Sequence, residues 1–282
     1  MVSPLVTAEW LKANLASVKT LDAGYHLTGV ERDPEAEFAA ARIPGACRFD
    51  INRVTDQANP LPHMLPPAAD FAAAASSMGI NNNDHVVIYD DSAILPATRV
   101  WWMFRLFGHE RVSVLDGGLA AWHRVGGDIE TTTPVIPTTG QFTTRPSVGA
   151  KVIDMSTIQA LISADSLGQL ADARGSSRFV GAAPEPRAGL RSGHIPGARN
   201  VPLTSLIDAN GSFLPVAGIR QAFLDGGIDP DRPVITSCGS GVTACGLALG
   251  LALVGNEQVF VYDGSWVEWG GSDAPIRTGD AD

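Results

Sequence analysis

The hydrophobic positions in the first half of the chain form short runs separated by a longer segment. The runs VVIYD (86–90) and VSVLD (112–116) are rich in β-branched side chains, and each ends in an acidic residue. Between them, LPATRVWWMFRLFG (95–108) has the length and apolar spacing of a helix. Short apolar runs that stop at turns are typical of buried strands. This half therefore predicts the order strand, helix, strand.

The second half of the chain shows the same order. PVITS (233–237) and VFVYD (259–263) are predicted strands, and TACGLALGLALVG (243–255) between them is a predicted helix. Strands joined by helices imply a parallel sheet that is covered on both faces. We therefore predict an α/β fold for each half.

Two motifs occur twice and indicate an internal repeat. Ile-Pro-Gly-Ala stands at 43–46 and 195–198, and an Asp-Gly pair follows a strand at Asp116 and Asp263, each with a Trp six residues beyond the Asp. The first motif recurs after 152 residues and the second after 147, so the first copy holds five extra residues. They fall in the interval that contains PLPHMLP (60–66). Such self-similarity indicates two copies of one structural unit.

The boundary between the copies is predicted from composition. The stretch TTTPVIPTTG (131–140) is rich in Thr and Pro and has no hydrophobic period, as expected for a linker. We therefore expect two tandem domains, 1–138 and 139–282, each a parallel sheet flanked by helices.

Charge and length exclude two classes of partner. The 282 residues carry a formal net charge of −10, which argues against a nucleic-acid surface because phosphate binding needs clustered Lys and Arg. The apolar stretch 244–255 is about a dozen residues long, whereas a membrane-spanning helix needs roughly 20. We expect neither nucleic acid nor a membrane as a partner.

The cysteine content indicates a reducing compartment. Three cysteines cannot form a disulfide framework, and the N-terminal residues lack the pattern of a signal peptide. We therefore expect a cytoplasmic protein. No Cys/His spacing suggests zinc, and we expect neither a metal nor an organic cofactor.

One cysteine stands where the strand 233–237 gives way to a helix. Ligands of parallel sheets bind at the carboxyl ends of strands, which is where Cys238 lies. Glycines allow the loop to curl so that successive N–H groups point inward, and the helix N-terminus adds positive potential. Such a nest stabilises a thiolate and suits a persulfide anion. Cys238 is the candidate nucleophile, and the rest of the loop 238–243 is the candidate cradle: Gly239, Ser240, Gly241, Val242 and Thr243.

The first copy is predicted to be catalytically silent. Aligning VVIYDD (86–91) with PVITSC (233–238) puts Asp91 at the position of Cys238, and a carboxylate cannot be a sulfur nucleophile. Of the other cysteines, Cys245 lies in the Ala/Leu-rich helix and Cys47 beside a strand start, so both are predicted to be structural.

Taken together, the tandem copies, the Ile-Pro-Gly-Ala motifs and CGSGVTA (238–244) resemble the two-domain rhodanese superfamily. The resemblance covers nearly the whole chain and implies that only the second domain is active. Members that use thiosulfate typically carry basic residues after the cysteine, whereas Gly-Ser-Gly is similar to the loop of 3-mercaptopyruvate sulfurtransferases. The chemistry agrees, because thiosulfate is a compact dianion while mercaptopyruvate carries its charge away from the sulfur.

The resemblance also assigns residues that bind the substrate. Arg178 and Arg187 match the family's two substrate-binding arginines. A guanidinium can bind carboxylate and keto oxygens with a bidentate geometry that Lys cannot copy.

The resemblance further implies a relay of Ser240, a histidine and an acidic residue, the last two from the first domain. His63 matches the histidine, and a Ser–His relay could deliver a proton to the enolate of the leaving pyruvate. Asp50 is the weaker candidate for the acidic member, because alternation along its strand can point it elsewhere. Asn52 stands where the family commonly has a second acidic residue. A site that includes His63 would lie between the domains.

The sequence thus predicts a ping-pong sulfur transfer by a monomer. Cys238 takes sulfur from 3-mercaptopyruvate, pyruvate leaves, and cyanide, a thiol or a thioredoxin-like protein accepts the sulfur. The alternatives are a thiosulfate sulfurtransferase and a non-enzymatic tandem binding module, which would lack a fast-reacting cysteine. A cysteine phosphatase is disfavoured, because its loop needs an Arg where this chain has Ala244.

Overall fold

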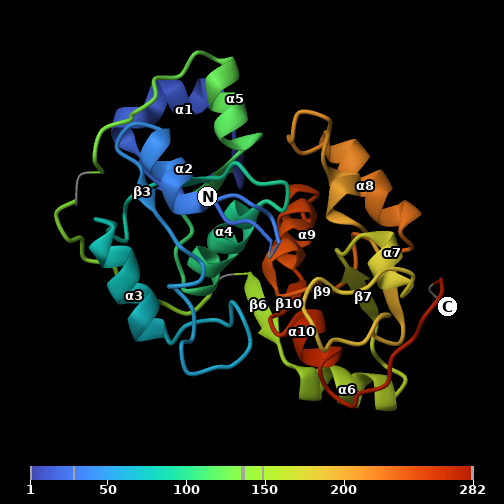
Figure 1. Cartoon of the computed structure of the whole chain (residues 1–282). Coiled ribbons are helices and arrows are strands. Elements are labelled where there is room, and N and C mark those ends of the chain that lie inside the picture. Colours follow the sequence, from blue (N-terminus) through green and yellow to red (C-terminus); the bar gives the residue numbers. More distant parts are fainter. Residues whose placement is uncertain (1, 28, 135–136, 148, 281–282) are drawn as a thin grey trace. The chain divides into compact units, whose positions relative to one another are not determined.

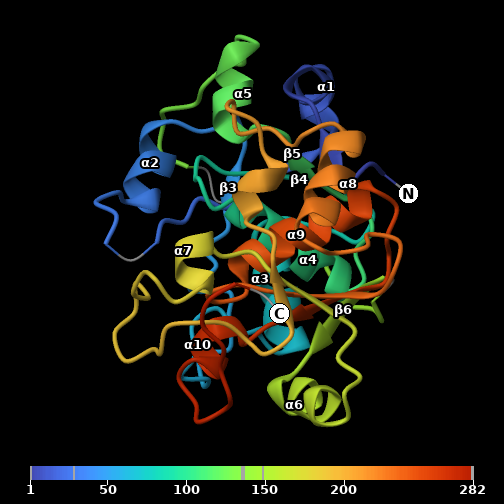
Figure 2. The ribbon, with the colours of Figure 1, turned by 90° about the vertical axis from the view of Figure 1, so that its right-hand side faces the viewer.

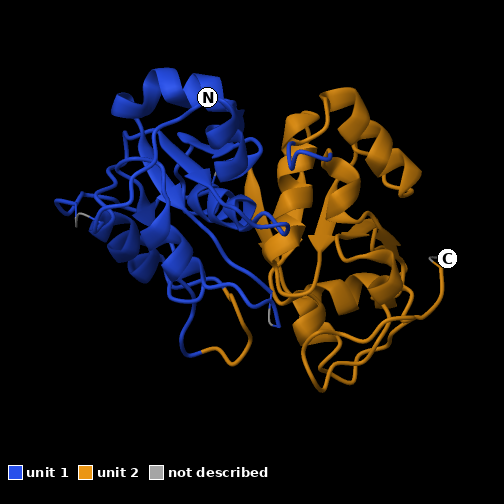
Figure 3. Cartoon of the chain, turned by 45° about the horizontal axis from the view of Figure 1, so that its top comes forward, with its two compact units in different colours: residues 1–58, 65–148, 209–212 blue, residues 59–64, 149–208, 213–282 orange. Residues whose placement is uncertain are grey.

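The chain folds into two compact units (Figure 3). The computed structural model describes residues 2–27, 29–134, 137–147 and 149–280, so residues 135–136 of the predicted linker lie outside the described residues. Unit 1 comprises residues 1–58, 65–148 and 209–212, and unit 2 comprises residues 59–64, 149–208 and 213–282. The predicted division at 138/139 falls ahead of Phe142, which packs against Phe71 and Phe104 of unit 1 with ring centroids 5.8 Å apart in each case.

Unit 1 is built on a five-stranded parallel sheet with the strand order β1-β5-β4-β2-β3. Figure 1 labels its helices α1 to α5. Its strands are β1 Leu5–Val6, β2 Lys19–Asp22, β3 Cys47–Arg48, β4 Val86–Tyr89 and β5 Val112–Leu115. Its helices are α1 Ala8–Asn14, α2 Pro34–Ala40, α3 Ala68–Ser77, α4 Pro96–Leu106 and α5 Gly118–Arg124, with a 3-10 turn η1 at Leu15–Ser17.

Unit 2 repeats this plan with the strand order β6-β10-β9-β7-β8, again all parallel. Its strands are β6 Ala150–Ile153, β7 Gln169–Asp172, β8 Ala198–Asn200, β9 Val234–Ser237 and β10 Val259–Tyr262. Its helices are α6 Met155–Ser163, α7 Ser176–Phe179, α8 Val216–Asp225, α9 Val242–Leu253 and α10 Ser265–Trp269, with a 3-10 turn η2 at Leu203–Leu206.

The central strand of each sheet, β4 or β9, is buried along its whole length. Every residue of β4 and of β9 is buried, as expected for strands covered on both faces. The α/β prediction is therefore confirmed for both halves.

The repeated motifs form the same local structure in both units. In each Ile-Pro-Gly-Ala motif the alanine N–H donates to the isoleucine carbonyl at 3.0 Å, and the glycine, Gly45 or Gly197, has φ of +74° or +78°. Pro followed by a left-handed glycine is the signature of a type II turn. The repeated tryptophans, Trp122 and Trp269, each donate their ring N–H to a carbonyl six residues later at 2.8 Å.

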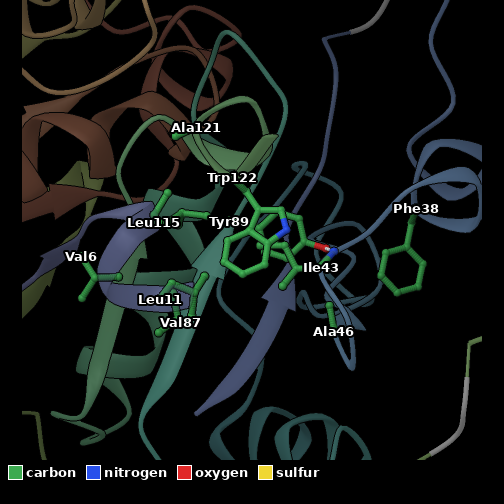
Figure 4. Packing of buried hydrophobic residues seen from close by; sticks show 11 residues of the cluster. Val6, Leu11, Phe38, Ile43, Ala46, Val87, Tyr89, Leu115, Ala121 and Trp122 are labelled. Carbon is green, nitrogen blue, oxygen red and sulfur yellow. Dashed lines mark hydrogen bonds between the residues drawn. The ribbon is translucent and has the colours of Figure 1, made fainter. Parts of the chain in front are cut away.

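The core on one face of the unit 1 sheet gathers around Trp122 and Tyr89 (Figure 4). Both rings are at most 1% exposed, and they pack with Leu11 and Val87. The Tyr89 hydroxyl accepts the N–H of Ile43 at 3.2 Å, which ties the Ile-Pro-Gly-Ala turn to the central strand.

Helix α9 is apolar on all sides and buried along most of its length. It packs on β9, β10 and η2, and Figure 2 shows α8 beside it. A Cβ added to Gly246 would lie 2.5 Å from the Leu203 side chain, and a Cβ added to Gly250 would lie 2.8 Å from that of Leu206. The two glycines therefore allow η2 to pack closely against the helix. This close packing fixes the N-terminus of α9, where the predicted nucleophile lies.

Strand pairing corrects one residue of the predicted repeat alignment. Val86 pairs with Val112, and the repeat of that pair is Val234 with Val259, so the central strands are offset by 148 residues rather than 147. Asp90, and not Asp91, therefore occupies the position of Cys238. The sequence alignment placed Val86 on Pro233 and so missed this one-residue shift.

In unit 1, the side chain of Asp90 shows how the loop after the central strand binds an acidic group. It is 4% exposed, and its two carboxylate oxygens accept the N–H groups of Ala97 (2.8 Å) and Ser92 (3.1 Å). Asp91 is turned outward and pairs with Arg32 at 2.9 Å. The loop between a central strand and its helix thus points amide hydrogens at the side chain that follows the strand.

We predict that Asp90 makes the protein less stable as the pH rises. Burial raises the pKa of Asp90 from 3.8 to about 7, so between these values the folded state holds a proton that the unfolded chain releases. Asp90→Asn removes this dependence on pH. The melting temperature of the variant minus that of the parent protein should therefore be larger at pH 8 than at pH 5. Asp91→Asn is the control and should show a much smaller trend, because it keeps the buried Asp90 carboxyl and removes only the smallest of the causes that raise the Asp90 pKa. An equal difference for Asp90→Asn at both pH values would contradict the assignment.

Candidate active site

The loop after β9 carries Cys238 in a buried position at the N-terminus of α9. Cys238 is 1% exposed, and Gly241, with φ of +76°, makes the turn into the helix. The carbonyls of Cys238 and Gly239 accept the N–H groups of Trp266 and Val267 of α10, both at 2.9 Å. Backbone N–H groups of the short helix α10 therefore bind the carbonyl oxygens of the Cys238 loop.

The opposite side of the loop presents amide hydrogens. Because the C=O and N–H of a trans peptide point in opposite directions, the amides of Gly239 and Ser240 face away from the acceptors in α10. Among the residues that the structure describes, none accepts a hydrogen bond from either amide. Buried or half-buried N–H groups are rarely left without an acceptor, so this pair favours an anionic ligand.

The amide of Cys238 itself has a different partner. Its N–H donates to the hydroxyl of Ser265 at 3.1 Å, and that hydroxyl donates to the carbonyl of Tyr262 at 2.8 Å. Ser265 is fully buried and has φ of +49°, a conformation that costs a non-glycine residue about 1–2 kcal/mol. The Cys238 amide is thus oriented by α10 and does not belong to the cradle.

Unit 1 shows what the same position looks like without this hydroxyl. Gly118 occupies the place of Ser265 with φ of +54°, and the next residue, Leu119, donates to the carbonyl of Asp90 at 2.9 Å. A Cβ on Gly118 would lie 2.2 Å from that carbonyl. Only the unit that carries the cysteine has a serine in this strained position.

Arg178 lies against the Cys238 loop. Its Nη2 atom would be 3.2 Å from a Cβ built on Gly239. The guanidinium is held by Glu185 through Nε–Oε1 at 3.3 Å and a second bond between Nη2 and Oε2. The structure therefore brings one of the two predicted substrate arginines to the loop, already paired with a carboxylate.

The predicted His63–Ser240 pair is formed. His63 Nδ1 lies 3.1 Å from the Ser240 hydroxyl, and the ring is buried. Residues 59–64, which lie within the interval between Pro44 and Asp91 to which the extra residues of the first copy were assigned, belong by their contacts to unit 2. His63 has φ of +63°, so the backbone is strained at the residue that reaches Ser240.

The remaining predicted residues have the following surroundings. Asp50 lies in unit 1, where it accepts the N–H of Asn52 at 2.8 Å and pairs with Arg53 at 3.4 Å. Arg187 is half-buried in unit 2 and has no hydrogen-bond or ion-pair partner among the described residues. The relay role of Asp50 and the binding role of Arg187 stay predictions.

Neither a metal cluster nor a membrane helix is found in the described part of the chain. No group of three or more His, Cys, Asp or Glu side chains there could hold a metal ion. No described helix has the length and apolar character to cross a bilayer.

Comparison with known proteins agrees with this geometry. The model of the rhodanese-like domain matches residues 7–125 and again residues 155–272. The chain belongs to the rhodanese family. The first match covers most of unit 1, and the second covers most of unit 2 and contains the Cys238 loop.

The rhodanese relatives are sulfurtransferases. The chain is 42% identical to the 3-mercaptopyruvate sulfurtransferase of Mus musculus, covering 94% of this chain and 91% of the relative. It is 40% identical to that of Escherichia coli K12, covering 96% and 97%. The crystal structure of SseA from Escherichia coli has a TM-score of 0.84 at 37% identity, covering 94% of this chain and 99% of that one. The protein is therefore a sulfurtransferase, as the family resemblance of the loop and repeats implied.

Sequence reasoning missed the residues that support Arg178. Arg174 is buried between Asp172 and Glu185, which bond to it at 2.7 and 2.8 Å. Burial lowers the pKa of Arg174, but the charges of Asp172 and Glu185 more than offset this, so its pKa lies above the ordinary value. The Asp-Ala-Arg sequence at the carboxyl end of β7 was the available signal, since ligand sites of this rhodanese fold collect at strand ends.

We predict that the hydroxyl of Ser265 controls the reactivity of Cys238 at a cost in stability. Ser265→Gly and Ser265→Ala both remove the acceptor of the Cys238 amide, so both should slow alkylation of Cys238 about tenfold. Only Ser265→Gly relieves the positive φ, so it should melt at a higher temperature than Ser265→Ala. Iodoacetamide kinetics and thermal unfolding measure the two effects. Alkylation of Ser265→Gly at the parental rate would contradict the role of the hydroxyl.

Proposed function

We propose that this rhodanese transfers sulfur from 3-mercaptopyruvate, through a persulfide on Cys238, to a thiol acceptor or to cyanide. The observation that carries the proposal is the Cys238 loop, which has no cationic side chain of its own and has two amides that find no acceptor in the described part of the chain. Several relatives are named 3-mercaptopyruvate sulfurtransferase.

In the first step, the Cys238 thiolate attacks the sulfur of 3-mercaptopyruvate. A sulfur–sulfur bond forms, the carbon–sulfur bond breaks, and its electron pair passes to carbon as the enolate of pyruvate. One proton then converts the enolate to pyruvate. The amides of Gly239 and Ser240 support the proposal because they can stabilise the thiolate before the step and the persulfide after it.

The pair of Ser240 and His63 is proposed to deliver that proton. The ring nitrogen and the hydroxyl are 3.1 Å apart, within reach for proton transfer. Ser240 is two residues from the nucleophile and 5% exposed, so bulk water competes little with it. Asp50 is kept as the weaker candidate for orienting the histidine.

In the second step, an acceptor nucleophile attacks the outer sulfur of the persulfide. Cyanide yields thiocyanate and regenerates the Cys238 thiolate, and a thiol yields its own persulfide. A thioredoxin-like protein is the acceptor we propose in the cell. A single chain supplies every residue of the proposed site, so a monomer suffices.

Arg178 and Arg187 are proposed to bind the carboxylate and keto oxygens of the donor. The alternative donor is thiosulfate, and a relative from Arabidopsis thaliana is named thiosulfate/3-mercaptopyruvate sulfurtransferase. The Gly-Ser-Gly loop favours mercaptopyruvate, because it places no cation directly beside the transferred sulfur.

We also propose a reducing location, the cytoplasm. All three cysteines are free thiols, and the reaction uses one of them as a thiolate. The relative from Arabidopsis thaliana is named as mitochondrial.

Steady-state sulfur transfer to cyanide tests the donor and the nucleophile together. We expect kcat/KM for 3-mercaptopyruvate to exceed that for thiosulfate by at least about tenfold, because the loop lacks the cation that a dianion needs beside its sulfur. Cys238→Ser should abolish transfer from both donors, while Cys47→Ser, which changes a half-buried thiol of unit 1, should not. Preference for thiosulfate would refute the donor, and activity in Cys238→Ser would refute the nucleophile.

Removal of the relay histidine should act on kcat rather than on binding. His63→Gln is expected to lower kcat with 3-mercaptopyruvate about a hundredfold and to leave KM nearly unchanged, since the proton is needed only after the donor is bound. His85→Gln is the matched control, because His85 forms a buried pair with Ser113 at 2.9 Å in unit 1. Equal kcat values in the two variants would exclude His63 from the reaction.

A further inference from the structure

Unit 1 has a pocket of its own at the carboxyl end of β2, the kind of place where parallel sheets bind ligands. Its volume is about 260 Å³, and three carboxylates line it, those of Asp22, Glu37 and Asp91. Gly24 and Leu119 are also part of its wall. Drug-sized ligands fill about 300–1,000 Å³, so this pocket suits a smaller molecule or a single side chain.

Strand pairing identifies the counterpart of this pocket in unit 2. Asp22 at the end of β2 is equivalent to Asp172 at the end of β7, because each is paired with the last residue of the central strand. Each of these carboxylates accepts the N–H of the residue two positions later, Gly24 at 2.8 Å and Arg174 at 2.9 Å. Gly24 therefore stands where unit 2 has Arg174.

In unit 2 the corresponding space holds a guanidinium group. Nε of Arg174 lies 3.1 Å from both carboxylate oxygens of Asp172, and its Nη2 bonds to one of them at 2.7 Å. The ring of Trp266 lies 4.3 Å from the guanidinium carbon. Leu119 is the counterpart of Trp266, since each donates its N–H at 2.9 Å to the carbonyl of the residue after the central strand. Because Asp22 and Leu119 both line the unit 1 pocket, the pocket includes the space that a guanidinium fills in unit 2.

A second position has opposite charges in the two units. Phe38 and Phe179 are equivalent, because the carbonyl of each is hydrogen-bonded to the side chain that precedes an Ile-Pro-Gly-Ala motif, at 3.4 and 2.9 Å. Glu37, the residue before Phe38, therefore stands where unit 2 has Arg178. The unit 1 pocket has a glycine and an anion at two positions that are cationic in unit 2.

The carboxylates of the pocket are short of positive charge. Among the described residues, Arg32 pairs with Glu37 at 2.6 Å and with Asp91 at 2.9 Å. Arg48 lies 3.6 Å from Asp22, and a carboxylate outside the pocket shares it at 3.4 Å. Burial raises the pKa of Asp22, and its hydrogen bond and Arg48 do not fully offset this. Three carboxylates thus face two arginines, which leaves a deficit of one cation.

We propose that this pocket of unit 1 binds a guanidinium group, which Asp22 holds as Asp172 holds the Arg174 side chain in unit 2. A planar guanidinium can donate two parallel hydrogen bonds to one carboxylate, which an ammonium group cannot copy. The group could belong to a small molecule or to an arginine side chain of a partner protein. The inference concerns binding to unit 1 and does not depend on the proposed sulfur transfer.

A titration of the full chain, labelled with ¹⁵N, with methylguanidinium tests the proposal by NMR. The backbone amide of Gly24 donates to Asp22, so its chemical shift reports on a cation at that carboxylate. We expect a saturable shift change of the Gly24 and Asp91 amides at millimolar concentration, weaker at high ionic strength. Methylammonium, which has the same charge, should give no saturable change at these amides.

Two variants with matched controls locate the site. Asp22→Asn keeps the size of the side chain and should raise the dissociation constant at least about tenfold, because it removes the charged acceptor. Asp70→Asn removes an exposed carboxylate on α3 of the same unit and should leave the constant unchanged.

Gly24→Arg supplies the guanidinium from the chain itself and should abolish the response of the Asp91 amide to methylguanidinium. Its control, Gly24→Ala, should retain that response, since the added Cβ meets only the Asp22 carboxylate at 3.0 Å and a Pro34 carbon at 3.9 Å. This pair keeps the test decisive if Asp22→Asn folds poorly.

Two further ligands separate the sources of the group. Agmatine represents a small molecule, and the peptide acetyl-Gly-Arg-Gly-amide represents a partner protein. Tighter binding of agmatine supports a small molecule, and tighter binding of the peptide supports a partner's arginine. An equal response to methylammonium, no saturable response to any guanidinium compound, or parental affinity in both Asp22→Asn and Gly24→Arg would overturn the inference.

Discussion

The carboxyl end of β9 sets the constraint on which the site in unit 2 depends. A central strand that is buried along its whole length must end in a turn, and here the turn enters a helix that is itself almost completely buried. Because both β9 and α9 are packed on all sides, neither can move to bring an acceptor to the loop amides. The N–H groups of Gly239 and Ser240 are thus left to an anion, and the sulfur of Cys238 is the atom the chain supplies there.

The two units show how one fold treats this constraint in two ways. In unit 1 the position of the cysteine is taken by Asp90, whose carboxylate fills the loop with an acidic group and closes it. In unit 2 the amides of Gly239 and Ser240 have no acceptor among the described residues, while Ser265 accepts the N–H of Cys238 and the N–H groups of Trp266 and Val267 donate to the loop carbonyls. Of the described non-glycine residues with positive φ, Ser265 and His63 are hydrogen-bonded to the Cys238 loop, whereas Leu95 has φ of +49° at the start of α4 in unit 1. Strain at the loop is of the kind that tends to concentrate at functional sites.

Sequence alone predicted the architecture and the nucleophile because both depend on local pattern. The apolar runs predicted β4 and β9, and the Gly-flanked strand end located Cys238. The pair of His63 and Ser240 was implied by the family resemblance and not by local pattern. The one-residue error at Asp91 arose because a strand register depends on the neighbouring strands, which no single segment encodes. The Arg174–Glu185 bridge was missed for a related reason, since it joins residues whose charges look solvated until burial is known.

Mass spectrometry of the intact protein after reaction with 3-mercaptopyruvate, without an acceptor, tests the central claim most directly. The account predicts a gain of one sulfur atom per chain, localised by peptide mapping to Cys238 and removed by cyanide as thiocyanate. The same treatment should leave Cys238→Ser unchanged in mass. Release of pyruvate with no sulfur retained on Cys238, or retention on Cys47 or Cys245 instead, would contradict a persulfide mechanism at the end of β9.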